Sequence, residues 1–234
     1  MEWFLATWAM YRRVFARAAV LALRNWPVLL TAFVYSALTT ASTWVALWLG
    51  FLGGIVTSLV FAACVSSFLH LVEVIIQSGK VSLEDFRRSF GMYLWDVVAL
   101  SFLAWIFFAF VTPAVLSLPQ GPVLLLCIHI GLFVFFNAVP ELIYLARLRL
   151  VDLLAQSYRF IGDNWIEWLP ANVAAAGLLV LLWSIPFPPF LAWVPVLLTP
   201  LLAYFWMVMR GLLFLELQST GRRGRIFQYR AGYR

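Results

Sequence analysis

The chain has 234 residues, of which 65% are hydrophobic and 11% are charged, and its formal net charge is +6 at pH 7. A soluble domain carries about 25% charged residues, and a domain of this size exposes too much surface to bury so many apolar side chains. The composition therefore excludes an ordinary soluble domain and indicates an integral membrane protein. It also argues against a nucleic-acid-binding protein, because no segment is long enough to form a solvated basic domain.

Three stretches contain no Asp, Glu, Lys or Arg: Asn25–Val72, Val97–Pro140 and Trp168–Met209, which are 48, 44 and 42 residues long. One bilayer span needs about 20 apolar residues, so each stretch predicts two spans joined by a tight turn. Glycine or proline clusters mark the turns at 50–54, 117–122 and 186–189. The six expected spans are about Pro27–Leu49, Ile55–Gln77, Val97–Leu116, Val123–Arg147, Leu169–Ile185 and Phe190–Leu217.

A junction recurs three times along the chain: a basic amphipathic segment reaches a tryptophan, and an apolar stretch follows. The tryptophans are Trp26, Trp95 and Trp165, which are 69 and 70 residues apart. We interpret the pattern as three repeat units, about 11–79, 80–149 and 150–220, in a single membrane domain over 1–234, with a basic tail at 221–234. The predicted fold is an all-α integral membrane protein in which six transmembrane helices form three tandem helical hairpins. An amphipathic interfacial helix precedes each hairpin.

The segments between the hairpins have helical periodicity. In Leu150–Asp163 the polar residues recur every three or four positions, with apolar residues on the opposite face. In the second segment, Ser82 and Asp85 have the spacing of a capping box. We expect these helices to lie in the membrane interface, where the three tryptophans anchor them. The expected polar stripe of the third segment is Asp152, Gln156, Arg159 and Asp163, and its expected apolar face is Leu150, Leu153, Leu154, Tyr158 and Ile161.

The positive charges predict the orientation. All 16 Lys and Arg residues lie between or beyond the hairpins, or at a span end on that side, as Arg147 and Arg210 do. By the positive-inside rule, both termini and the amphipathic helices face the cytoplasm. Five arginines in the tail either contact anionic lipid heads or form a docking segment for an acidic partner; they are Arg222, Arg223, Arg225, Arg230 and Arg234.

Ionisable residues inside spans are functional candidates. Glu73, Glu141 and Glu216 each lie near the inner end of the second span of a unit. They could converge to bind a cation, relay protons or pair with Arg210. Alternatively, each could bond to a neighbouring amphipathic helix and fasten its unit. The further polar candidates are His70, three residues from Glu73, and Asn137, four residues from Glu141.

No metal, cofactor or catalytic motif is recognisable. The His-x-x-Glu pair occurs once and in the reverse of the order used by di-iron bundles, so a hydrogen-bonded pair is the better interpretation. Cys64 and Cys127 form no C-x-x-C motif and are expected to be small buried residues. There is no P-loop, no H-E-x-x-H and no G-x-S-x-G, so we do not expect an enzyme.

Three short motifs resemble the multi-pass membrane domain of glycerophosphoryl diester phosphodiesterases and related stand-alone bacterial membrane proteins of unknown function. They are Leu23–Pro27, Gly79–Phe86 and Gly162–Trp165. The resemblance implies a six-helix module in a bacterial cytoplasmic membrane that anchors or assists other subunits or copies of itself. Two hypotheses follow: a non-catalytic scaffold subunit, or a transport-type module for an ion, lipid or other small molecule.

Overall fold

The computed structural model describes residues 2–148, 150–219 and 224, and every regular element among them is a helix. Six of these helical segments are long and apolar enough to cross a membrane, in agreement with the six predicted spans. The protein is therefore an all-helical, multi-pass membrane protein. The segments are Trp26–Leu49, Leu52–Ser78, Leu94–Leu116, Gly121–Ala146, Leu150–Ser184 and Pro189–Ser219.

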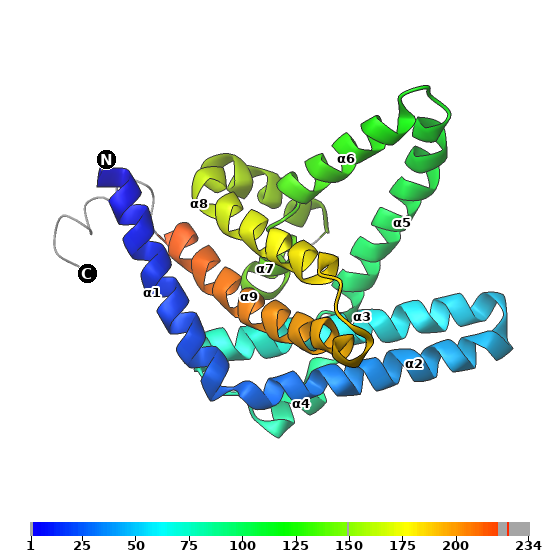
Figure 1. The fold of residues 1–234 in the computed structure, drawn as a ribbon, viewed down its shortest axis with the longest axis horizontal. Helices are drawn as coiled ribbons and strands as arrows, with labels where there is room; N and C mark the ends of the chain where they lie inside the picture. The colour runs from blue at the N-terminus through cyan, green and yellow to red at the C-terminus, as the bar shows by residue number, and fades with distance from the viewer. Residues whose placement is uncertain (1, 149, 220–223, 225–234) are drawn as a thin grey trace. The chain divides into compact units, whose positions relative to one another are not determined.

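Figure 1 shows the order of the elements along the chain. The α-helices are α1 (Glu2–Arg24), α2 (Thr31–Leu49), α3 (Phe51–Ser78), α4 (Leu83–Ser89), α5 (Leu94–Leu116), α6 (Gly121–Phe135), α7 (Val139–Glu141), α8 (Leu150–Ser184) and α9 (Trp193–Ser219). Two short 3₁₀ helices and a π-helix complete the list: η1 (Trp26–Leu30), η3 (Pro189–Leu191) and the π-helix η2 (Leu142–Ala146).

The chain divides into two compact units, which are described separately below. The first unit comprises Met1–Val34, Val72–Ser82 and Asn164–Arg234, and the second comprises Tyr35–Leu71 and Leu83–Asp163. The helices α2, α3 and α8 each contribute a part to both units. These units do not follow the boundaries of the three predicted sequence repeats, so the repeats stay a prediction.

In the first unit, α1 packs along α9, and Figure 1 shows the two helices side by side. The contact face of α1 is a buried stripe that recurs every fourth residue, as one face of a helix requires. Three of its five members are alanines, which let the two helix axes approach closely. The stripe consists of Ala6, Met10, Val14, Ala18 and Ala22, and the buried residues of α9 include Tyr204, Val208 and Leu212.

Tight turns connect consecutive spans at the predicted positions. Gly50 separates α2 from α3 and has a left-handed φ of +55°, which glycine adopts without strain. In the second turn, α5 ends at Leu116 and α6 begins at Gly121, where a Cβ atom would lie 2.4 Å from the Val115 carbonyl oxygen. The close backbone approach therefore requires glycine. In the first unit, α8 ends at Ser184 and η3 begins at Pro189, which brackets the third predicted turn.

Three residues leave the helical conformation just before the three anchor tryptophans, and we call them the elbow residues. They are Asn25 (φ −108°, ψ 28°), Tyr93 (φ −119°, ψ 14°) and Asn164 (φ −127°, ψ 15°). All three therefore have nearly the same backbone geometry, in the sparsely populated bridge region. The elbow at Asn164 lies inside α8, so the third amphipathic segment and the fifth span form one bent helix.

Proline interrupts the fourth span. Helix α6 ends at Phe135, and Pro140, five positions later, lies in the short helix α7. The interruption frees the carbonyl of Phe135, and the hydroxyl of Ser157 donates a hydrogen bond to it at 2.9 Å. Within the second unit, this contact fastens the first part of α8 to the broken span.

Candidate functional site

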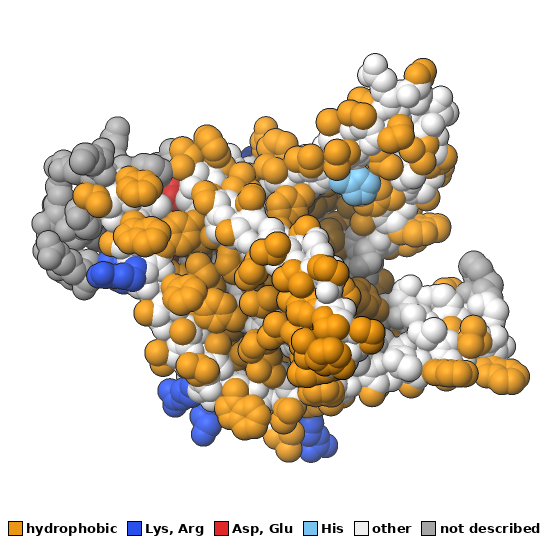
Figure 2. Space-filling model, viewed as in Figure 1, with side chains coloured by type: hydrophobic (Ala, Val, Ile, Leu, Met, Phe, Trp, Pro, Cys, Tyr) orange, Lys and Arg blue, Asp and Glu red, His pale blue; other side chains and the backbone are white. Residues whose placement is uncertain are grey.

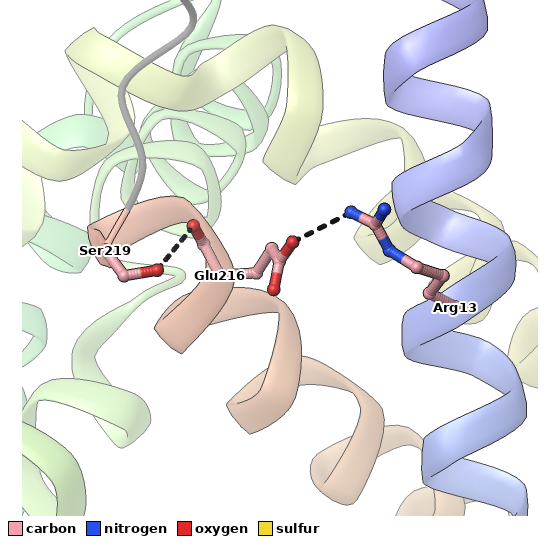
Figure 3. Close-up of polar contacts among 3 residues, drawn as sticks. All are labelled: Arg13, Glu216 and Ser219. Atoms are coloured by element: carbon pink, nitrogen blue, oxygen red, sulfur yellow. Dashed lines mark hydrogen bonds and ion pairs between the residues drawn. The ribbon is translucent and has the colours of Figure 1, made fainter. Parts of the chain in front are cut away.

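An ion pair connects two helices of the first unit at one of the predicted intramembrane acids. Nη2 of Arg13 on α1 lies 3.1 Å from Oε1 of Glu216 on α9 (Figure 3). The two side chains are 41% and 34% exposed, so solvent or lipid heads reach the pair. The sequence left two alternatives for Glu216, a shared site with the other acids or a bond to a neighbouring amphipathic helix. The ion pair with Arg13 corresponds to the second. The same residue's backbone carbonyl accepts a hydrogen bond from Ser219 Oγ at 3.2 Å.

The buried elbow residue Asn25 is a second fastening point. Its Nδ2 donates to the carbonyl oxygens of Leu21 at 2.9 Å and Gly79 at 3.1 Å, while its Oδ1 accepts from the Val81 N–H at 2.9 Å. Two of the motifs that carry the family resemblance therefore meet here, the end of α1 and the segment after α3. Tyr204 of α9 also donates to the Asn25 carbonyl, at 3.2 Å. The residue thus connects three chain segments, two of them through its side chain and α9 through its backbone carbonyl.

Arg210 lies against aromatic side chains of the first unit. Its guanidinium carbon is 5.3 Å from the ring centroid of Trp168, a cation–π distance. Trp168 is fully buried and meets Phe214 edge to face, with ring centroids 6.3 Å apart. The predicted residues Arg210 and Glu216 therefore lie on the same helix, and each contacts a different partner element.

The sequence analysis missed Glu167, which is fully buried in the first unit. The Tyr11 hydroxyl donates a hydrogen bond to the backbone carbonyl of this residue. Burial raises the pKa of Tyr11 to about 12, and the negative charge of Glu167 acts in the same direction. The sequence does single out Glu167, because this acid directly precedes the long uncharged stretch that begins at Trp168.

Asn172 is a further buried polar residue that sequence analysis missed. Its Nδ2 donates to the Trp168 carbonyl at 2.7 Å, one turn earlier on α8. Among the described residues, its buried Oδ1 has no hydrogen-bond partner. An unpaired acceptor is costly in an apolar environment, so this position is a weak point of the helix packing or a place for a polar group.

The remaining predicted acids are also buried. Glu73 is 2% exposed and accepts a hydrogen bond from Gln77 Nε2 at 3.1 Å, and Glu141 is fully buried. Left-handed residues follow both acids six positions later, Gly79 with φ +74° and Arg147 with φ +51°. Glu73 and Glu216 belong to the first unit and Glu141 to the second. The convergence of the three carboxylates therefore stays a prediction.

His70 and Asn137 lie in the second unit. The His70 ring is 6.2 Å from the ring of the elbow residue Tyr93, and Asn137 is buried. No group of three His, Cys, Asp or Glu side chains that could hold a metal ion occurs in the part of the chain that the structure describes.

A serine cluster in the second unit was not predicted. Ser66 Oγ donates to the Ser89 carbonyl at 3.2 Å and accepts the Tyr93 N–H at 2.9 Å. Ser67 shares hydrogen bonds with the hydroxyls of Ser89 and Tyr35. These contacts hold the C-terminal end of α4 and the residues up to Tyr93 against α3, within one unit. The rings of Phe86 and Phe90 also pack on Tyr35.

The three anchor tryptophans are exposed on the protein surface, Trp26 by 58%, Trp95 by 73% and Trp165 by 53%. This exposure is what contact with the membrane interface requires. In Figure 2, hydrophobic side chains cover much of the visible face of the protein. The tail arginines Arg222, Arg223, Arg225, Arg230 and Arg234 lie outside the described residues.

One prediction about an individual side chain was wrong. Cys127 is exposed, unlike Cys64, because it lies on the outer surface of α6. Tyr158 of the expected apolar face is 58% exposed, whereas Leu153, Ser157, Phe160 and Ile161 of the same segment are buried. On the predicted polar stripe of the same segment, Asp152, Arg159 and Asp163 are exposed and Gln156 is half-buried.

Comparisons with known proteins returned no match. No family model matches the chain, and no curated protein and no solved structure matches it.

Proposed function

We propose that the protein is a non-catalytic membrane subunit that anchors or scaffolds a larger assembly through a basic cytoplasmic face. The observation that carries the proposal is the ion pair between Arg13 and Glu216. It uses one of the three predicted intramembrane acids to fasten α1 to α9. A second fastening point, Asn25, uses its side-chain donor and acceptor groups inside the protein. Polar groups used in this way stabilise a fixed shape, which suits a scaffold.

The proposed architecture is three tandem hairpins, each preceded by an amphipathic helix. The similar backbone geometry of the three elbow residues supports it, as does the left-handed residue six positions after Glu73 and after Glu141. The distribution of Lys and Arg supports a cytoplasmic location for both termini. We assign the protein to a bacterial cytoplasmic membrane, following the resemblance to the membrane domain of glycerophosphoryl diester phosphodiesterases.

The partners in this proposal are anionic lipid heads and other protein subunits or further copies of the chain. The basic residues that would contact them include Arg12, Arg13 and Arg17, which are exposed on α1. Exposed cations close to a membrane surface are each attracted by anionic lipids. Acidic surfaces of a partner subunit would satisfy the same charges.

The experiment is purification in a mild detergent followed by mass analysis of the intact complex. The proposal predicts additional subunits in fixed stoichiometry, or a defined homo-oligomer. A single free chain in lipid-preserving conditions, without any partner, would contradict it.

A transport-type module is the second candidate, and the burial of Glu73 and Glu141 favours it. Buried carboxylates in membrane proteins often serve in proton or cation pathways. Simultaneous replacement of Glu73, Glu141 and Glu216 by Gln would then abolish flux of the transported species in vesicles. A folded triple variant that retains flux or the phenotype of the host would eliminate this role for the glutamates.

A further inference from the structure

The second unit contains a cavity of about 560 Å³ that neither candidate function uses. Its walls come from α5, α6, the break around Pro140 and the first part of α8. The volume falls within the range of small-molecule sites, about 300–1,000 Å³. The lining side chains are apolar with one exception, which is His129.

His129 is held in one orientation by two contacts. Its Nδ1 lies 2.7 Å from the Leu125 carbonyl oxygen, one turn earlier on α6. Its ring also stacks on Phe108 of α5, with centroids 5.0 Å apart and an interplanar angle of 19°. A ring held in this way presents its second nitrogen, Nε2, in a fixed direction.

The first contact determines the chemistry of that second nitrogen. A carbonyl oxygen only accepts hydrogen bonds, so Nδ1 carries the proton in a contact of this length. In a neutral imidazole the other nitrogen is then an acceptor without a proton. Among the described residues, none donates a hydrogen bond to His129 Nε2. Among the described lining residues, His129 is the one whose side chain can offer such an acceptor to a molecule in the cavity.

The position of His129 along α6 determines whether water can reach this acceptor. It lies eight residues after the start of α6 at Gly121, or roughly 12 Å along a helix axis. In the proposed topology this depth is within the hydrocarbon region, where water does not satisfy an acceptor. A molecule that enters from the bilayer and donates a hydrogen bond would remove the free-energy cost of leaving this acceptor unpaired. None of the described lining residues is Lys or Arg, so a phosphate group finds no counter-charge among them.

We propose that this cavity binds a neutral, single-chain lipid that carries a hydroxyl group. The hydroxyl donates its hydrogen bond to Nε2 of His129, and the hydrocarbon chain lies against Leu103, Phe107, Leu132 and Phe136. The site lies within one unit and goes beyond the proposed function, because it is the same for a scaffold and for a transporter.

The test uses the protein in lipid nanodiscs and a hexadecanol that carries a photoreactive diazirine in its chain. Unlabelled hexadecanol and hexadecyl methyl ether, which lacks the hydroxyl proton, compete for the site. The alcohol should compete about tenfold better than the ether, the factor that one good hydrogen bond contributes. Labelled peptides should come from 100–108 and 129–140. Equal competition by both compounds, or labelling confined to other spans, would overturn the proposal.

Three variants separate the acceptor from the cavity. His129→Phe keeps an aromatic ring against Phe108 but removes the acceptor, so the alcohol and the ether should compete equally. Ala104→Trp fills the cavity from an exposed position and should abolish specific labelling, and Val123→Phe, outside the lining, should leave labelling unchanged. Leu132→Trp serves as a second filling variant if Ala104→Trp loses its thermal transition. Unchanged labelling in a folded filling variant would place the lipid elsewhere and contradict the proposal.

Discussion

Arg13 and Glu216 lie 203 residues apart in the chain, and their side chains meet at 3.1 Å. The contact joins the first helix of the protein to the last span, inside one compact unit. Because both side chains are partly exposed, their attraction is screened and contributes little free energy by itself. Its importance lies in position, since it sets how far α1 extends along α9 in the same unit.

A double-mutant cycle on this pair should give a small coupling energy. We expect Arg13→Gln and Glu216→Gln each to lower the free energy of unfolding by about 0.5 kcal/mol, and the double variant by no more than either one. Thermal unfolding in detergent at low and at high salt measures the effect, which should shrink at high salt. Additive losses in the double variant would show that the two charges do not interact.

Asn25→Ala should be far more destabilising, by about 2 kcal/mol. The substitution removes three side-chain hydrogen bonds and leaves the Gly79 carbonyl and the Val81 N–H without their partner. Thr43→Ala is a suitable control, because the Thr43 hydroxyl is exposed and, within the described part of the chain, bonds only to the Thr39 carbonyl of its own helix. Equal melting temperatures for the two variants would mean that Asn25 does not fasten the unit.

Gly79→Ala should cost roughly 1–2 kcal/mol, because an L-residue with a side chain is strained at the left-handed φ of Gly79, +74°. Gly131→Ala is the matched comparison. Gly131 lies inside α6, and a Cβ atom there meets no heavy atom within 4 Å, so alanine should be neutral or stabilising. Chemical denaturation of both variants in detergent measures the difference. Equal stability would show that the turn after α3 tolerates another backbone conformation.

The stability of the protein should fall at alkaline pH through Tyr11. The pKa of Tyr11 is raised from 10.0 to about 12 in the folded state, so the folded protein favours the neutral phenol. The contribution of Tyr11 is therefore complete below pH 10 and is lost as the pH rises towards 12. Melting temperatures of the wild type and Tyr11→Phe across this window should converge as the pH rises. Parallel curves would exclude Tyr11 as a source of the pH dependence.

The number of spans and the turns between them could be predicted, because hydropathy and turn chemistry act over short stretches of sequence. Two turns have backbone geometry that only glycine satisfies easily, one at Gly50 and one in the segment that ends at Gly121. The break near Pro140 was likewise predictable, since proline removes a helical hydrogen bond at its own position. These features need no knowledge of the distant packing partners.

The polar contacts between distant segments could not be predicted in the same way. The partner of Glu216 depends on how α1 aligns with α9, which no local pattern specifies. Glu167 and Asn172 were missed because burial depends on the packing of helices, whereas the sequence analysis considered only acids near the inner ends of spans. The exposure of Tyr158 illustrates the same point, since an apolar or aromatic residue at a helical spacing can still face lipid.

Reporter fusions test most directly whether the chain forms three hairpins whose basic connecting segments share one side of the membrane. One fusion carries a reporter inserted after Leu118, in the turn between α5 and α6, and the other carries it after the last residue, Arg234. Two reporters, one active only in the cytoplasm and one only outside it, provide opposite readouts at each position. The account predicts an external Leu118 and a cytoplasmic C-terminus. An external C-terminus, or two positions on the same side, would contradict it.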